Sequence, residues 1–129
     1  MQINNPVVVA EVRRAFEMYE TALMTNDTTT LDALFWDHPA VLRYGVGEVL
    51  KGKAAISAFR RERVVTDLAR SLTDIVITTY GDDVATAFCE YRRTGSGRSG
   101  KQSQTWLRTP DGWRIAAAHV SLAEAEGGR

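Results

Sequence analysis

Two residues of this sequence combine a reactive type with a suggestive position, Arg43 and Tyr19. Arg43 lies within residues 40–48, where β-branched residues predict a strand and two glycines predict a tight reversal. If it points inward, it needs an anionic partner, because an unpaired buried charge is prohibitively costly. That partner is a protein carboxylate, such as Glu48 or Glu90, or a ligand carboxylate bound by the planar guanidinium. We favour the ligand, because an arginine suits a cavity on this strand.

Tyr19 lies on the apolar stripe of an expected first helix. The helix begins at Asn5-Pro6, a capping residue followed by a residue that suits the first turn. The stripe recurs at intervals of three and four residues and consists of Val8, Val12, Phe16, Tyr19 and Leu23. The Tyr19 hydroxyl could donate to a developing oxyanion or to a substrate carbonyl. Alternatively, it is a core tyrosine whose hydroxyl reaches the rim.

Two expected strands near the C-terminus carry further candidates. Gln104 and Trp106 share a face of residues 102–109, so Gln104 could bind an amide or carboxylate and Trp106 could form an apolar wall. A glutamine on an exposed sheet face is the simpler alternative. His119 and Ser121 lie on the strand expected at residues 113–122. By the two-residue period they share a face with Trp113, Ile115 and Ala117.

His119 could act as an acid or a base near neutral pH, or it could be a hydrogen-bonded core histidine. A nucleophilic pair of Ser121 with His119 is disfavoured, because no third, orienting acid is evident. No histidine or cysteine spacing matches a metal site, and we expect no cofactor. Cys89 lies in an expected strand and is interpreted as a small core residue.

The order of elements predicts an α+β fold. Helices are expected at residues 6–24, 28–35 and 53–63, a hairpin at 40–52, and long strands at 70–80, 84–93, 102–109 and 113–122. Three N-terminal helices would pack on one face of a strongly curved, antiparallel or mixed sheet, leaving a cavity beneath the first helix. The basic end of the third helix, residues 60–63, is interpreted as a solvated helix end. We expect one domain over residues 1–129.

The composition excludes several classes of protein. Lys and Arg total 16, as do Asp and Glu, so no basic excess indicates nucleic-acid binding. The single cysteine cannot form an internal disulfide, which favours a reducing compartment. Neither a signal peptide nor a membrane-spanning stretch is evident, so a cytoplasmic location is expected.

Several motifs together carry a family resemblance. They are residues 1–6, 35–36, 43–48, 77–81, 102–106 and 113–121, which reach from one end of the chain to the other. With them the chain resembles the nuclear-transport-factor-2-like superfamily, a cystatin-like α+β cone that includes SnoaL-like polyketide cyclases and ketosteroid isomerases. More narrowly, it resembles the HpxZ/AtzH-type family linked to oxalurate and ureide catabolism.

The resemblance implies a ligand and a set of roles. Ketosteroid isomerases of this superfamily use a tyrosine on the first helix, which Tyr19 matches, and an aspartate base on the first strand. Arg43 stands near the place of that aspartate, which favours an anionic ligand over a carbon acid. The implied substrate is a small carboxylated urea, hydrolysed or decarboxylated and deamidated without a cofactor. Arg43, Tyr19 and His119 are the catalytic candidates, and Tyr44, Gln104, Trp106 and Ser121 are the substrate-binding candidates.

Two other functions stay open. The chain could be a non-catalytic protein that binds a small acid or partners an amidase, or it could be a SnoaL-like isomerase or cyclase. A homodimer is also expected, because apolar residues make both faces of the sheet partly apolar. These residues are Ile75, Ile77, Phe88 and Leu107.

Overall fold

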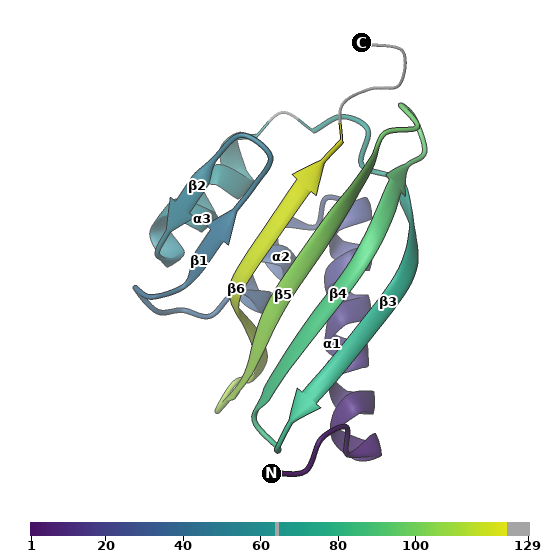
Figure 1. Cartoon of the computed structure of the whole chain (residues 1–129). Coiled ribbons are helices and arrows are strands. Elements are labelled where there is room, and N and C mark those ends of the chain that lie inside the picture. Colours follow the sequence, from purple (N-terminus) through teal and green to yellow (C-terminus); the bar gives the residue numbers. More distant parts are fainter. Residues whose placement is uncertain (64, 124–129) are drawn as a thin grey trace.

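The computed structural model describes residues 1–63 and 65–123 of the chain, which form three helices and six strands (Figure 1). The helices are α1 (Pro6–Met24), α2 (Thr28–Leu34) and α3 (Lys53–Glu62). The strands are β1 (Leu42–Tyr44), β2 (Val49–Lys51), β3 (Arg70–Tyr80), β4 (Val84–Arg93), β5 (Ser99–Thr109) and β6 (Gly112–Leu122). Within this part of the chain, no helix is long and apolar enough to cross a membrane.

The six strands form one mixed sheet in the order β2-β1-β6-β5-β4-β3. Strand β1 runs parallel to β6, and the other neighbouring pairs are antiparallel. All three helices lie behind the sheet in Figure 1, so one face is covered and the other is open. The predicted α+β arrangement of three N-terminal helices on a mixed sheet is therefore confirmed.

Helix α1 forms where the sequence predicts it. The Asn5 side chain accepts a hydrogen bond from the backbone N–H of Val7 at 3.0 Å, which satisfies one of the free donors of the first turn. The apolar stripe packs into the core, with Val12 and Phe16 almost completely buried and Tyr19 only 4% exposed. This burial fixes the rotation of the helix, and with it the direction of Tyr19.

A β-bulge in β6 overturns one expectation about the faces of that strand. Trp106 of β5 pairs with Ile115, but Thr105 pairs with Ala117, so Ala116 is an extra residue. An extra residue reverses the alternation of side chains beyond it. Trp113 and Ile115 therefore face the core, whereas His119 lies exposed on the opposite face. The shared face predicted from strict alternation is wrong, and so is a core position for His119.

The expectation of a solvated end for α3 is also wrong. Arg60 is only 2% exposed, although Arg61 and Glu62 beside it are exposed. Arg60 follows Ile56, a completely buried residue, by four positions and therefore lies on the same face of the helix. The guanidinium group of Arg60, at the basic end of α3, is therefore buried inside the protein.

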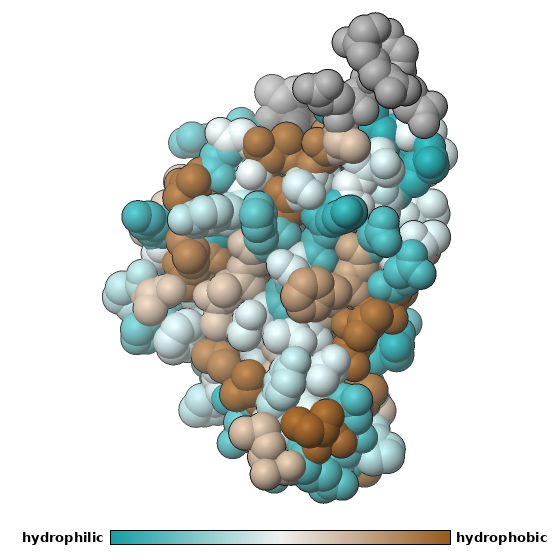
Figure 2. All heavy atoms as spheres, in the orientation of Figure 1, coloured by the Kyte–Doolittle hydropathy of each residue, from teal (hydrophilic) through white to brown (hydrophobic). Residues whose placement is uncertain are grey.

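The open face of the sheet carries one row of paired residues across all six strands. Pairing places Val76, Phe88, Ser103, His119, Tyr44 and Val49 side by side in this row. Phe88 and Val76 at one end are 54% and 56% exposed. Figure 2 looks onto this face and shows apolar residues interspersed with polar ones.

Truncating Phe16 tests the assignment of the α1 stripe. Phe16→Ala should lower the free energy of unfolding by about 3–5 kcal/mol, because it removes a completely buried ring and leaves a cavity. Met18→Ala is the matched control, since Met18 lies on the same helix and is 52% exposed, and its effect should stay within about 0.5 kcal/mol. Urea denaturation followed by circular dichroism measures both. Equal effects for the two variants would contradict the assignment.

Candidate functional site

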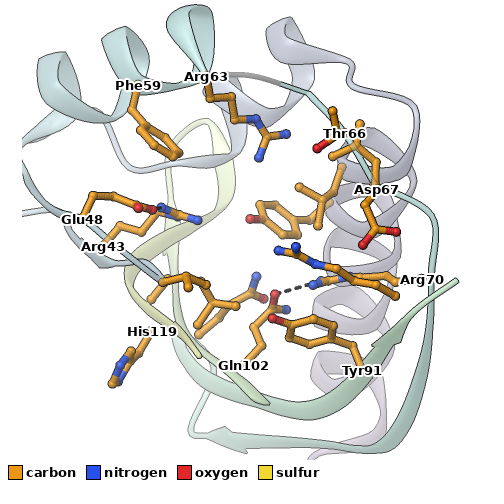
Figure 3. Close-up of a pocket in the computed structure, with 18 residues that line it drawn as sticks. Arg43, Glu48, Phe59, Arg63, Thr66, Asp67, Arg70, Tyr91, Gln102 and His119 are labelled. Atoms are coloured by element: carbon orange, nitrogen blue, oxygen red, sulfur yellow. Dashed lines mark hydrogen bonds and ion pairs between the residues drawn. The ribbon is translucent and has the colours of Figure 1, made fainter. Parts of the chain in front are cut away.

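A cavity of about 260 Å³ lies between the helices and the covered face of the sheet. Its walls come from α1, α3, the β1–β2 turn, the segment after α3, and all strands except β2. Figure 3 shows Arg43, Arg63 and Arg70 pointing into it from different sides. The cavity therefore brings together cationic side chains that lie far apart in the sequence.

Arg43 points inward, as expected, and has a protein partner. Its side chain is 9% exposed, and Nη1 donates to Oε1 of Glu48 at 2.7 Å. The Glu48 Oε2 accepts from the backbone N–H of Gly47 at 3.1 Å. The Arg43 guanidinium also lies over the Phe59 ring, 5.1 Å from its centroid. Both Arg43 and Glu48 line the cavity, so the ion pair and the proposed ligand contact occupy the same place.

A second, more deeply buried ion pair forms the opposite wall. The Glu20 carboxylate accepts from Arg70 Nε at 3.0 Å and from Arg70 Nη2 at 2.5 Å, in the bidentate geometry of strong arginine–carboxylate pairs. The same Nη2 donates to Gln102 Oε1 at 2.8 Å. The guanidinium stacks 4.5 Å from the centroid of the Tyr91 ring. These contacts hold Arg70 rigidly against the cavity.

Arg63 also faces the cavity, and it makes fewer hydrogen bonds than Arg70. Its Nη2 donates to Asn26 Oδ1 at 3.5 Å, and its Nε is buried without a hydrogen-bond partner among the described residues. Burial, together with the positive charge of Arg60, lowers the pKa of Arg63 to about 10. The side chain remains protonated at neutral pH, so its charge is available to an anion in the cavity.

Tyr19 places its oxygen among these cations. Arg60 Nη2 donates to Tyr19 Oη at 2.9 Å. Burial by itself raises the pKa of the Tyr19 phenol. The positive charges of Arg60, Arg43 and Arg70 lower it by more, so that its pKa lies below the ordinary value. Arg43 and Tyr19, separated by 24 positions of sequence, thus contribute to one cavity as predicted.

The charges around Tyr19 do not balance. The guanidinium groups of Arg43, Arg60, Arg63 and Arg70 surround it, and the neighbouring carboxylates are those of Glu20 and Glu48. Two positive charges therefore lack a carboxylate partner in this buried group. At the mouth, Arg93 and Asp67 add one charge of each sign, which leaves the excess unchanged.

Gln104 and Trp106 share the inward face of β5, as predicted, and have different positions. Gln104 lines the cavity, and its Oε1 accepts from the Trp106 indole N–H at 3.1 Å. Trp106 is completely buried and is not among the residues that line the cavity. Its contact fixes the amide orientation of Gln104, which directs the amide nitrogen away from the indole.

Three other candidates from the sequence lie on the open side of the sheet. The Tyr44 ring is 41% exposed and packs edge to face on His119, with 5.8 Å between centroids. The backbone of His119 borders the cavity, but Figure 3 shows its ring pointing away from it. Ser121 lines a shallow groove on the open face. The structure therefore does not bring these three side chains to Tyr19.

The sequence interpretation missed several residues of the site, and simple spacing could have identified three of them. Glu20 follows Phe16 by four positions and so continues the buried row of α1. Arg60 follows Ile56 by four positions on α3, and Arg63, the C-cap residue of that helix, follows it by seven. Arg70 begins a strand and carries no such signal.

Other possible chemistry is limited by burial and composition. Burial raises the pKa of the Cys89 thiol to about 11, so it is protonated at neutral pH and is no ready nucleophile. Within residues 1–63 and 65–123, no cluster of three or more His, Cys, Asp or Glu residues could hold a metal ion. The chemistry of the described site is that of arginine, tyrosine, glutamate and amide groups.

The fold is that of a cystatin-like protein of the NTF2-like superfamily. An NTF2-like protein from Pseudomonas putida superimposes with a TM-score of 0.81 over 97% of this chain and 94% of its own, at 18% identity, which shows the shared fold. More specifically, the chain belongs to the AtzH-like family, whose sequence profile matches residues 1–126.

Two more similar structures are known. A protein of unknown function from Pectobacterium atrosepticum is 51% identical, with a TM-score of 0.91 and 95% of each chain covered. A cystatin-like fold protein from Burkholderia xenovorans is 45% identical, with a TM-score of 0.90, over 95% of this chain and 96% of that one. No curated protein matches the chain.

Substitution of Glu20 tests how much the buried ion pair of Glu20 and Arg70 contributes to the stability of the fold. Glu20→Ala should lower the free energy of unfolding by about 3–5 kcal/mol, because it leaves the Arg70 charge buried and unpaired. Replacing both residues by Met should cost much less, since no unpaired charge remains. Thermal and urea unfolding measure both variants. The interpretation fails if the double variant loses as much stability as Glu20→Ala.

Proposed function

We propose that this protein is an enzyme that acts on a small carboxylated urea of the oxalurate type, in the catabolism of nitrogen compounds. The reaction is hydrolysis of an amide bond, or decarboxylation coupled to deamidation. The observation that carries the proposal is the excess of two positive charges around the Tyr19 oxygen. Membership of the AtzH-like family supports it, because the family resemblance implies this class of substrate. We place the reaction in the cytoplasm.

The cavity suits a small anion in both charge and size. A volume of about 260 Å³ is below the usual range for drug-sized ligands, which is about 300–1,000 Å³. Arg43 would bind the carboxylate through its planar fork, and Arg63 would stabilise the negative charge that develops on the carbonyl oxygen. Gln104, oriented by its indole contact, would bind the amide portion.

Hydrolysis in this setting requires two proton movements. Water loses a proton as its oxygen forms a bond to the urea or amide carbonyl carbon, whose π electrons move to the carbonyl oxygen. The carbon–nitrogen bond then breaks, and the leaving nitrogen takes up a proton. The surrounding guanidinium groups stabilise the developing negative charge. Tyr19 lies next to these cations, and its phenolic oxygen can exchange a proton with these atoms.

A proton-transfer isomerase or cyclase of the SnoaL type is the second candidate. The observation that favours it is Glu48, a carboxylate that lines the cavity beside Arg43 and could abstract a proton. Both Glu48 oxygens already accept hydrogen bonds, from Arg43 and from the Gly47 backbone. Neither oxygen is therefore free of a protein partner, and hydrolysis remains the preferred function.

Substitution of Arg43 and Tyr19 tests the proposed enzyme. Arg43→Lys should lower kcat/KM for oxalurate or a related carboxylated urea by about 100-fold, because lysine keeps the charge and loses the bidentate fork. Tyr19→Phe should lower kcat by about 100-fold or more, because it removes the group that exchanges protons. Ammonia release and mass spectrometry of products measure turnover.

An exposed arginine of α1 provides the control for these variants. Arg13→Lys should leave both rate constants unchanged, because Arg13 is exposed on the helix surface. Wild-type rates for both Arg43→Lys and Tyr19→Phe would contradict the mechanism. Tight binding of the acids without turnover would instead identify a non-catalytic acid-binding protein or the partner of an amidase.

We also propose that the open face of the sheet forms a homodimer. The exposed Phe88 and Val76 lie side by side there and would be covered by a second copy. Phe88→Arg should convert a dimer into a monomer, because it would bury a charge at the interface. Arg13→Ala, on the exposed surface of α1 away from the open face, is the control. Light scattering after gel filtration measures the mass, and a monomeric wild type would contradict the proposal.

A further inference from the structure

Arg60 is a buried cation to which the proposed reaction assigns no role. It is 2% exposed and lies beside two aromatic rings, with its guanidinium carbon 5.9 Å from the centroid of Tyr19 and 5.6 Å from that of Phe35. Its Nε and Nη1 atoms have no hydrogen-bond partner among the described residues. The contact of Nη2 with Tyr19 Oη, at 2.9 Å, is its one hydrogen bond in that part of the chain.

The nearby carboxylates already accept hydrogen bonds from groups other than Arg60. Both oxygens of Glu20 accept from Arg70, and Glu48 accepts from Arg43 and from the Gly47 backbone. A buried charge without compensation is costly, so the Arg60 cation favours a negative charge on the one oxygen it contacts. That oxygen belongs to Tyr19.

The direction of the hydrogen bond adds a second constraint. A guanidinium group carries donors only, so Arg60 cannot accept the proton of Tyr19. When Tyr19 holds its proton, the O–H must point away from Arg60. The remaining directions include the cavity, which Tyr19 lines. Arg60 does not line the cavity itself, so it acts on a ligand only through Tyr19.

We infer that Arg60 is a positioning residue that holds the Tyr19 oxygen as the general base of the reaction and directs it toward the cavity. This inference rests on the proposed function for the identity of the reaction. It supplies the base that the sequence assigned to His119, whose ring lies outside the cavity (Figure 3).

Several charged groups face Tyr19 from the elements packed around it. They are Arg60 of α3, Arg63 just after the end of α3, Arg43 of β1 with its partner Glu48, and Arg70 of β3 with its partner Glu20 of α1. The positive charges outnumber the negative ones, and the pKa of Tyr19 is lowered despite its burial. Among the cations that lower it, Arg60 has the largest effect.

The proton transfers then balance within the site. The Tyr19 phenolate takes a proton from water while the water oxygen bonds to the carbonyl carbon. The neutral Tyr19 hydroxyl gives that proton to the leaving nitrogen as the carbon–nitrogen bond breaks. The phenolate is restored, and the net reaction consumes one water molecule.

Titration of Tyr19 in the intact protein tests this inference without any substrate. The ultraviolet absorbance of phenolate is followed with pH in the wild type, and subtraction of the Tyr19→Phe titration isolates Tyr19 from the other three tyrosines. Arg60→Met should move the Tyr19 titration to higher pH, because the compensating cation is lost. Arg60→Lys should retain most of the wild-type behaviour.

Two further variants separate this role from a structural one. Arg60→Gln keeps a possible donor to Tyr19 and removes the charge, so its titration should also move to higher pH. Arg61→Met changes the exposed neighbour on α3 and should leave the titration unchanged. Folding of each variant is checked by circular dichroism. Wild-type titration of Tyr19 in both Arg60→Met and Arg60→Gln would overturn the inference.

The activity measurement links the titration to catalysis. With a substrate that turns over, Arg60→Met should lower kcat about tenfold or more at neutral pH and move the rising limb of the pH profile to higher pH. An unchanged pH profile would overturn the inference. If no carboxylated urea turns over in the wild type, the proposed function fails, and the titration still decides whether Arg60 controls the ionisation of Tyr19.

Discussion

The structure of the site depends on the cost of burying arginine side chains. Each guanidinium removed from water must be compensated by hydrogen bonds, by a carboxylate or by an aromatic face. Arg70 obtains all three, through Glu20, Gln102 and Tyr91. Arg43 has Glu48 and the Phe59 ring. The other two arginines around Tyr19 have no carboxylate partner among the described residues, and this imbalance is the basis of the proposed anion binding.

The fold assembles this imbalance from elements that are ordinary in themselves. The apolar stripe of α1 turns Tyr19 and Glu20 toward the sheet. Burial of Ile56 on α3 carries Arg60 inward on the same face. The parallel pairing of β1 with β6 sets Arg43 opposite Ala118, a small side chain that leaves room for the cavity. Packing that stabilises the domain therefore also positions the charged groups.

The sequence allowed prediction of the elements, the α+β class and the inward direction of Arg43. It also anticipated, through the helix stripe together with the resemblance to the NTF2-like superfamily, that Tyr19 would lie close to Arg43 in one cavity. It failed for His119, since a bulge of one residue at Ala116 reverses the faces of β6 and leaves no mark in the pattern. It failed for Arg60, because a charged residue at a helix end is usually solvated.

The sequence by itself determined the helices and strands and most of their ends, since capping residues, turns and apolar periodicity act over short distances. An exception is β5, which begins at Ser99 and not at Gln102 as predicted. Only the tertiary structure decided which charges meet. Glu20 and Arg70 are 50 positions apart, and Tyr19 and Arg60 are 41 apart. Their pairing depends on how α1, α3 and the sheet pack together. For that reason the positive excess around Tyr19, which underlies both the proposed function and the role of Arg60, emerges only in the folded chain.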